Sequence, residues 1–310
     1  MKKKIFLLVV VIALLVVVLA GCTSTPAHKI LDETWGNYEK ITYEVTRTLK
    51  DENNKDNIKI KGTSTITTER ISNADITVGS RNIKNFLGSV VTIDTSLEDG
   101  SKMTAKVAFK TNFEPVASYK NIDIKGYKNN SPEKDTKQTI EMYYNDEKCY
   151  YTTTINGTKK EDSIKTGKWI KTPFYDNLMI YNIARSCYKK DMKSDNYSFS
   201  ALQVKVLSVS DYTMKTLSVA NKFPNGTIKL FNPENNKDLP EDKGIKADTL
   251  NITLNQKFPG SGAPMVVSIS REKKDYNGIN ITTDRIPLVI IEGDMHYKII
   301  DFTTTKSAQA

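Results

Sequence analysis

Alternation of apolar and polar residues with a period of two constrains this chain more than any other feature. Ile41, Tyr43 and Val45 are separated by polar residues, and the alternation resumes from Ile58 to Ile71. Similar segments rich in Thr, Val, Ile and Tyr follow at 90–95, 104–110, 116–125, 137–144, 149–155, 202–209, 214–219, 228–231, 249–257, 265–271, 279–283, 289–292 and 295–304. Short links that contain Asn-Gly or Asp-Gly join them, whereas parallel strands need long crossovers. The pattern therefore predicts a large antiparallel sheet.

Two segments instead repeat their apolar residues at helical spacing. Residues 28–39 form the first. Residues 172–190 form the second, in which Thr172-Pro173 is typical of a helix start. Apolar residues cover more than half of this second helix, so we expect it to lie against or inside a curved sheet. The expected fold class is mainly β (α+β): a large curved antiparallel sheet or half-barrel with one or two covering helices.

The first 21 residues have the three parts of an export signal: basic residues, an apolar run from Ile5 to Ala20, and small residues at the end. The junction Leu19-Ala20-Gly21-Cys22 resembles the lipobox of bacterial lipoproteins, in which the cysteine thiol receives a diacylglyceryl group and cleavage leaves that cysteine first. The alternative is a retained membrane helix, but 16 apolar residues fall short of the roughly 20 that span a bilayer. Two or three acyl chains such as palmitate on Cys22 would anchor the chain firmly.

This interpretation divides the chain into unequal parts. Residues 1–21 are a lipoprotein signal peptide, 22–27 a lipidated tether, 28–305 one β-rich domain, and 306–310 a flexible tail. A second domain boundary at 129–135 is the alternative. We expect the protein at the extracytoplasmic face of the cell membrane, held there by the lipid on Cys22.

The excess of basic residues does not indicate a nucleic-acid-binding protein. The formal net charge of +9 falls to +6 once the three lysines of the signal peptide are removed. Arginine forks are the usual readers of phosphate and guanine, but only six arginines are present, and they are scattered. Lysine runs are short and mixed with acids, as at 159–162. We interpret this charge as a solvated surface beside an anionic bilayer.

Cysteines and histidines leave few options for cofactor chemistry. Cys149 and Cys187 remain after lipidation, and they form either a disulfide or two half-buried thiols. Only two histidines occur, His28 and His296, and the HExxH, CxxC and GxSxG motifs are absent from the sequence. We expect no metal and no cofactor.

Paired carboxylates are the remaining catalytic feature, since two acids can hydrolyse a wall glycan. Such pairs occur at Asp94 with Glu98, at Glu241 with Asp242, and at Glu292 with Asp294. Acids at strand ends and in loops are common, and a tight hairpin turn explains Glu292-Gly293-Asp294 equally well. The chain is expected not to be an enzyme.

An acylated cysteine, a curved antiparallel sheet and a few covering helices resemble the LolA/LppX type of envelope lipid carriers. Phe113-Glu114-Pro115-Val116-Ala117-Ser118 and Tyr175-Asp176-Asn177, which leads into a helix ending near Arg185, are similar to segments of uncharacterised Gram-positive lipoproteins. The resemblance implies a half-barrel that holds a hydrophobic ligand. The first hypothesis is thus a binder or carrier of a lipid or glycolipid, and the alternative is a structural or protein-interaction module of the envelope.

Overall fold

The structure is a computed structural model of the chain. It describes residues 35–49, 58–128, 131–145, 147–169, 174–187, 196–203, 208–217, 227–228, 231–232, 237–238, 245–255, 265–270, 273–276, 278–282 and 285–305. The signal peptide, Cys22 and the tether, the tail at 306–310, and most of the first expected helix lie outside these residues.

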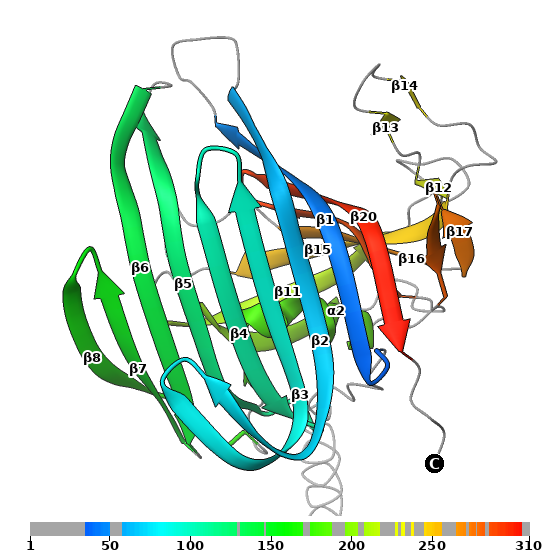
Figure 1. Ribbon diagram of the computed structural model, residues 1–310. Coiled ribbons are helices and arrows are strands. Elements are labelled where there is room, and N and C mark those ends of the chain that lie inside the picture. The colour runs from blue at the N-terminus through cyan, green and yellow to red at the C-terminus, as the bar shows by residue number, and fades with distance from the viewer. Residues whose placement is uncertain are drawn as a thin grey trace, which may run out of the picture.

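One sheet dominates the described part of the chain (Figure 1). Its N-terminal half contains β1 (Tyr38–Leu49), β2 (Ile58–Val78), β3 (Arg81–Leu97), β4 (Lys102–Lys110), β5 (Pro115–Lys128), β6 (Ser131–Asn145), β7 (Lys148–Ile155) and β8 (Thr158–Lys165). Its C-terminal half contains β9 (Phe174–Asp176), β10 (Asn196–Gln203), β11 (Ser208–Leu217), β12 (Thr227–Ile228), β15 (Ile245–Asn255), β16 (Met265–Ser270), β19 (Pro287–Glu292) and β20 (Met295–Thr305).

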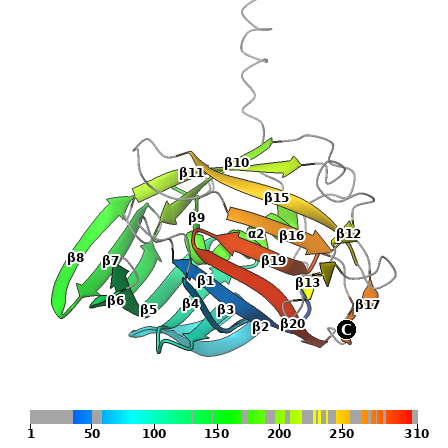
Figure 2. The same ribbon diagram turned by 90° about the horizontal axis from the view of Figure 1, so that it is seen from above.

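The sheet is built from two meanders joined at their ends. Its order is β8-β7-β6-β5-β4-β3-β2-β1-β20-β19-β16-β15-β11-β10-β9, and β12 pairs with β15. The join is the pairing of β1 with β20, which brings the two ends of the described chain together. Every pair in the sheet is antiparallel except β9 with β10. The predicted large, curved antiparallel sheet is therefore confirmed, and Figure 2 shows it curling around one short helix, α2 (Ile180–Cys187).

The two faces of the sheet are covered differently. On the concave face, Ile41, Tyr43 and Val45 of β1 are buried, as their alternation predicts. On the convex face, the end of the long β2–β3 hairpin packs Val78 and Phe86 against small residues of β4 and β5. The sequence prediction ended the second strand at Ile71, but β2 continues to Val78 before the chain turns back.

Both helix predictions need correction. Tyr38 and Glu39 begin β1 instead of ending a helix, because β1 pairs with β2 on one side and with β20 on the other. The second helix begins later than Thr172: Phe174–Asp176 is strand β9, the 3₁₀ turn η1 (Asn177–Met179) follows, and then α2. The cap of η1 is Asp176, whose Oδ1 accepts the Leu178 N–H at 2.9 Å.

An aromatic cluster closes the core near the start of β1. Trp35 meets Phe109 and Phe113 edge-on at centroid distances of 6.0 and 5.7 Å, and Phe109 stacks on Phe113 at 5.6 Å. Phe113 has a φ of 68°, a conformation that costs a non-glycine residue free energy. The buried aromatic contacts of the Phe113 ring offset that cost.

The remaining predicted features lie at the periphery. Residues 129–130 are outside the described chain, and β6 begins directly after them and pairs with β5, so the suggested boundary coincides with a hairpin link. Within the polar stretch 232–244, β14 (Lys237–Asp238) pairs with β13 (Phe231–Asn232). A second small hairpin joins β17 (Lys274–Tyr276) to β18 (Ile279–Ile281).

Candidate functional site: the interior beneath the covering helix

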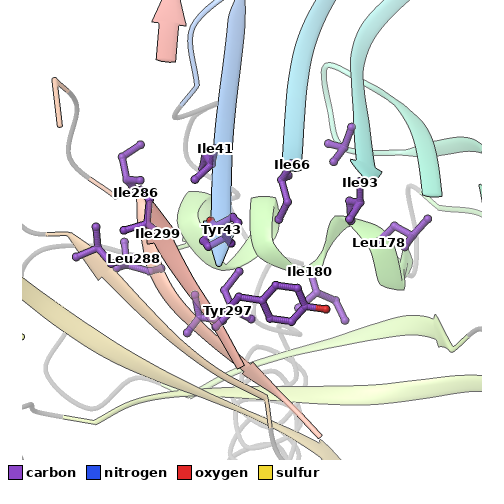
Figure 3. Packing of buried hydrophobic residues seen from close by; sticks show 14 of the residues in the cluster. Ile41, Tyr43, Ile66, Ile93, Leu178, Ile180, Ile286, Leu288, Tyr297 and Ile299 are labelled. Atoms are coloured by element: carbon purple, nitrogen blue, oxygen red, sulfur yellow. The ribbon is translucent and has the colours of Figure 1, made fainter. Parts of the chain in front are cut away.

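The concave face is a continuous apolar wall. It is assembled from strands of both meanders, and Figure 3 shows Ile41, Ile66 and Ile93 from the first meander with Leu288 and Ile299 from the second around the helix. These residues face inward because each occupies the same phase of its strand as its cross-strand partner, as Ile41 does with Ile66 and Ile66 with Ile93. The register therefore places the apolar residues of neighbouring strands on the same inner face of the sheet.

The segment η1–α2 covers this wall. Leu178, Met179, Ile180 and Ile183 are buried against the sheet, and all four belong to the same core cluster as the wall residues. The helix is only eight residues long, which is too short to be stable in isolation. Its position therefore depends on contacts with the sheet.

A buried ion pair fixes the C-terminal part of α2. Arg185 Nη1 and Nη2 donate to Glu39 Oε1 and Oε2 at 2.5 and 3.0 Å, and Arg185 Nε donates to the Arg285 carbonyl oxygen at 2.6 Å. Both side chains are 2% exposed. The bidentate geometry compensates two charges that would otherwise be costly inside the fold.

A buried carboxyl group fixes the beginning of the segment. The Tyr144 hydroxyl on β6 donates to Asp176 Oδ2 at 2.6 Å. Burial raises the pKa of the Asp176 carboxyl, while hydrogen bonds from Ser118, Tyr144 and the Leu178 N–H lower it, and the net shift is upward. Burial also raises the pKa of Tyr144, so the phenol stays a donor.

Cys149 lies beside this carboxyl group and carries a free thiol. Its Sγ donates to the Tyr150 carbonyl oxygen at 3.8 Å, and burial raises its pKa to about 12, with a contribution from Asp176. The possible Cys149–Cys187 disulfide stays a prediction. The side chain of Cys187 lies outside the described residues.

Several small polar side chains also face the interior. Ser64 and Thr95 share a hydrogen bond at 2.8 Å, and Trp35 Nε1 donates to Ser89 Oγ at 3.2 Å. On α2, Asn182 Nδ2 donates to Thr68 Oγ1 at 3.5 Å. These contacts place several polar side chains of β2 and β3 within an otherwise apolar interior.

The candidate paired acids within the described residues are placed as follows. Glu292 accepts a hydrogen bond from the Tyr181 hydroxyl at 2.8 Å, and Asp294 pairs with Arg47 at 2.9 Å. Gly293 between them has a φ of 62°, as the tight β19–β20 turn requires. Asp94 points outward from β3. Glu241 and Asp242 lie outside the described chain.

No cluster of three or more metal-ligating side chains occurs in the part of the chain that the structure describes. Across those same ranges, no helix has the length and apolarity needed to cross a bilayer. The lipidation motif Leu19-Ala20-Gly21-Cys22 lies outside the described residues, so its role stays a prediction.

Sequence reasoning missed the pair Glu39–Arg185 and the pair Asp176–Tyr144. A signal for the first was present, since Glu39 shares the phase of Ile41 and Tyr43 and so falls on the buried face. Arg185 follows Ile183 within an apolar stretch, which was a signal for burial. A basic residue near the end of a helix is, however, explained equally well by its favourable interaction with the helix dipole. The second pair joins residues 32 positions apart, and no spacing rule predicts such a contact.

The sequence matches no protein-family model and no curated protein. Among solved structures, a beta-barrel-like protein of domain of unknown function DUF1849 from Brucella abortus aligns with 88% of this chain and 100% of its own. The identity is 9% and the TM-score is 0.46. The fold assignment made above rests on strand order and register within this chain.

Proposed function

We propose that the protein is a lipid-anchored, extracytoplasmic, non-enzymatic binding protein that takes an amphiphile into the half-barrel beneath η1–α2. The lipobox-like motif ending at Cys22 supports the anchor and the location. The barrel-like β body supports ligand binding, because such folds hold small apolar ligands in their interior.

One observation carries the ligand part of the proposal. Within the described residues, a wide apolar wall built from both meanders is covered by the eleven residues of η1–α2 and not by a second sheet. The contacts that hold this segment are concentrated at Asp176 and at Arg185. Displacement of α2 would uncover Ile41, Ile66 and Ile299 together, and an acyl chain could replace the buried area that is lost.

Tryptophan fluorescence tests uptake directly. Trp169 donates from Nε1 to the Phe174 carbonyl oxygen at 3.0 Å and meets Tyr175 edge-on, so it reports on the start of the covering segment. In the Trp35→Phe variant Trp169 is the only tryptophan left. We expect lipoprotein in vesicles with brominated acyl chains to lose Trp169 emission relative to unbrominated vesicles, because bromine quenches on contact. Equal emission in the two vesicles would contradict uptake.

The anchor is tested separately. Cys22→Ala should remove incorporation of radioactive palmitate and shift the protein out of the membrane fraction. The matched control is Cys187→Ser, which should retain both label and fractionation. A wild-type protein that carries no acyl label would overturn the anchor without touching the ligand proposal.

A second function is favoured by a different observation. Strand β8 is an end of the sheet, and seven of its eight side chains are exposed, so its outer edge is open to a partner protein. Lysines and acids on β8 oppose nonspecific pairing and suit a polar partner. A photocrosslinker at Lys160 should capture one dominant protein in cells if this function holds, whereas the same crosslinker at Lys84 on the β2–β3 hairpin should not.

A further inference from the structure

Two buried polar side chains on one face of α2 have oxygens without partners. Asn182 and Ser186 are one helical turn apart, and their exposed fractions are 2% and 0%. Asn182 contacts Thr68 through Nδ2 only, and within the described part of the chain neither Asn182 Oδ1 nor Ser186 Oγ makes a hydrogen bond. Buried polar atoms are paired in the large majority of cases, so these two oxygens require an explanation.

Several polar groups in the same interior are paired. The Ser64 and Thr95 hydroxyls pair with each other, Ser89 accepts from Trp35, and the charges of Arg185 and Glu39 are matched. Three other buried oxygens in the described residues also lack a partner, Asp123 Oδ1, Asn177 Oδ1 and Thr282 Oγ1, but only Asn182 and Ser186 lie together on one face of α2.

We propose that Asn182 and Ser186 are the contact site for the hydroxyl groups of an uncharged amphiphile, such as an acylglycerol or a glycolipid. This inference rests on the proposed function and specifies its ligand. A hydroxyl both donates and accepts, so it pairs with the amide of Asn182 in either orientation and with the hydroxyl of Ser186. The acyl chain would then lie along the apolar wall formed by Ile41, Ile66 and Ile299.

The local charge selects against an anionic headgroup. Arg185 lies one residue before Ser186, but its charge is already matched by the Glu39 carboxylate in a bidentate pair. A carboxylate or phosphate placed beside α2 would therefore bring an uncompensated charge into the interior, which is strongly unfavourable. An uncharged polyol avoids this cost.

Entry requires α2 to separate from β2, because both side chains are closed off from solvent. The empty form carries unpaired polar atoms, which destabilise it, and a bound hydroxyl removes that penalty. Replacement of Ser186 by alanine removes an unpaired hydroxyl and breaks no hydrogen bond of that hydroxyl, so it should leave the empty protein equally or more stable while it weakens the headgroup contact. Opposite effects on stability and binding distinguish a ligand contact from a structural role.

The experiment uses the full-length lipoprotein in polymer discs and two photoreactive probes with the same diazirine acyl chain, a monoacylglycerol and a free fatty acid. We expect the wild type to be labelled about tenfold more by the monoacylglycerol, which corresponds to one or two hydrogen bonds. Asn182→Leu should bring this ratio close to one, and Ser186→Ala should lower it by about fivefold. Ser64→Ala removes a buried hydroxyl that already has a partner, and it should leave the ratio unchanged.

The outcomes separate the two proposals. If neither probe labels the wild type, the proposed binding function fails. If both probes label it equally, or if Asn182→Leu and Ser186→Ala keep the preference of the wild type, binding stands and the hydroxyl site is overturned. Thermal unfolding of each variant without probe provides the second readout, and a melting temperature of Ser186→Ala well below that of the wild type also overturns the site.

Discussion

The two ends of the covering segment are held by different chemistry. At the C-terminal part of α2, two full charges, Arg185 and Glu39, meet in a bidentate pair that is almost completely buried. At the start of η1, a buried carboxyl group with a raised pKa, Asp176, meets the phenol of Tyr144. The first contact needs both charges present, whereas at Asp176 burial favours the protonated acid and the hydrogen bond from Tyr144 favours the ionised form.

This difference matters for how the segment could be released. Breaking the ion pair leaves a buried charge without compensation, so that end is held strongly at any neutral pH. Breaking the Asp176 contact removes one hydrogen bond from a carboxyl group whose raised pKa eases its protonation, which costs less than an unpaired buried charge. We therefore expect α2 to open first from the Asp176 end, and four variants test that order.

The largest effect is expected from Arg185→Met. It leaves the Glu39 carboxylate buried and unpaired, and the free energy of unfolding should fall by about 3–5 kcal/mol. Urea denaturation of the purified protein measures it. The double variant Glu39→Leu with Arg185→Met should recover most of the loss because no charge is then buried. Asp75→Asn, which breaks the exposed Lys84 pair, is the control and should leave the urea midpoint unchanged.

Tyr144→Phe should have an intermediate effect at the other end. Asp176 loses a buried donor, and the free energy of unfolding should fall by about 1–3 kcal/mol. Cys149 offers a local measurement, because a buried thiol with its pKa raised to about 12 reacts with iodoacetamide only after the structure opens. In a Cys187→Ser background, alkylation should speed up by roughly 5- to 150-fold, the equivalent of that free energy. Unchanged alkylation would show that Tyr144 does not hold this end.

Asp176→Asn separates charge from shape at the same position, with a smaller effect that depends on pH. The folded state binds the Asp176 proton more tightly than the unfolded state does. Its contribution is therefore full below the unfolded pKa and is lost as the pH rises through the raised folded pKa. Asparagine keeps the cap but does not titrate. Wild type and variant should match near pH 4, and the variant should be the more stable near pH 8. A difference that is constant between these pH values would refute the assignment.

The sequence predicts a strand of this sheet well only where one face of the strand is apolar and buried. The strands of the concave wall were predicted within a few residues, because burial on one face imposes a period of two. Strand β8 was interpreted as solvated surface, since its side chains are polar on both faces and no alternation marks it. The end of the β2–β3 hairpin was missed for a related reason: it packs on the convex face through widely spaced residues such as Val78 and Phe86.

The site was less predictable than the sheet. The helical pattern indicated that an apolar helix lies inside the curve, and it does, but Phe174 was counted as part of that helix when it belongs to β9. Phe174 is in a strand because β9 pairs with β10, and the local sequence preference does not predict that pairing. Adjacent tyrosines follow the period of two: Tyr144 and Tyr151 are buried, while Tyr143 stays partly exposed beneath Arg81, whose Cζ lies 4.8 Å from the ring centroid. Contacts across the interior depend on the curvature of the sheet, which brings together residues far apart in the chain.

The smallest effect is expected from Tyr181→Phe. This variant tests whether the covering segment is held at the first turn of α2 as well as at Asp176 and Arg185. Tyr181 donates to Glu292 at 2.8 Å and so links the helix to the end of β19. Glu292 is exposed, so water can replace the Tyr181 hydroxyl there, and Tyr181→Phe should lower the free energy of unfolding by only about 0.5–1.5 kcal/mol. Glu292→Gln should match it, and the double variant should add nothing, because the same hydrogen bond is lost in each. A loss as large as that of Arg185→Met would mean that Glu292 anchors the helix directly, and opening from the Asp176 end alone could then not uncover the wall.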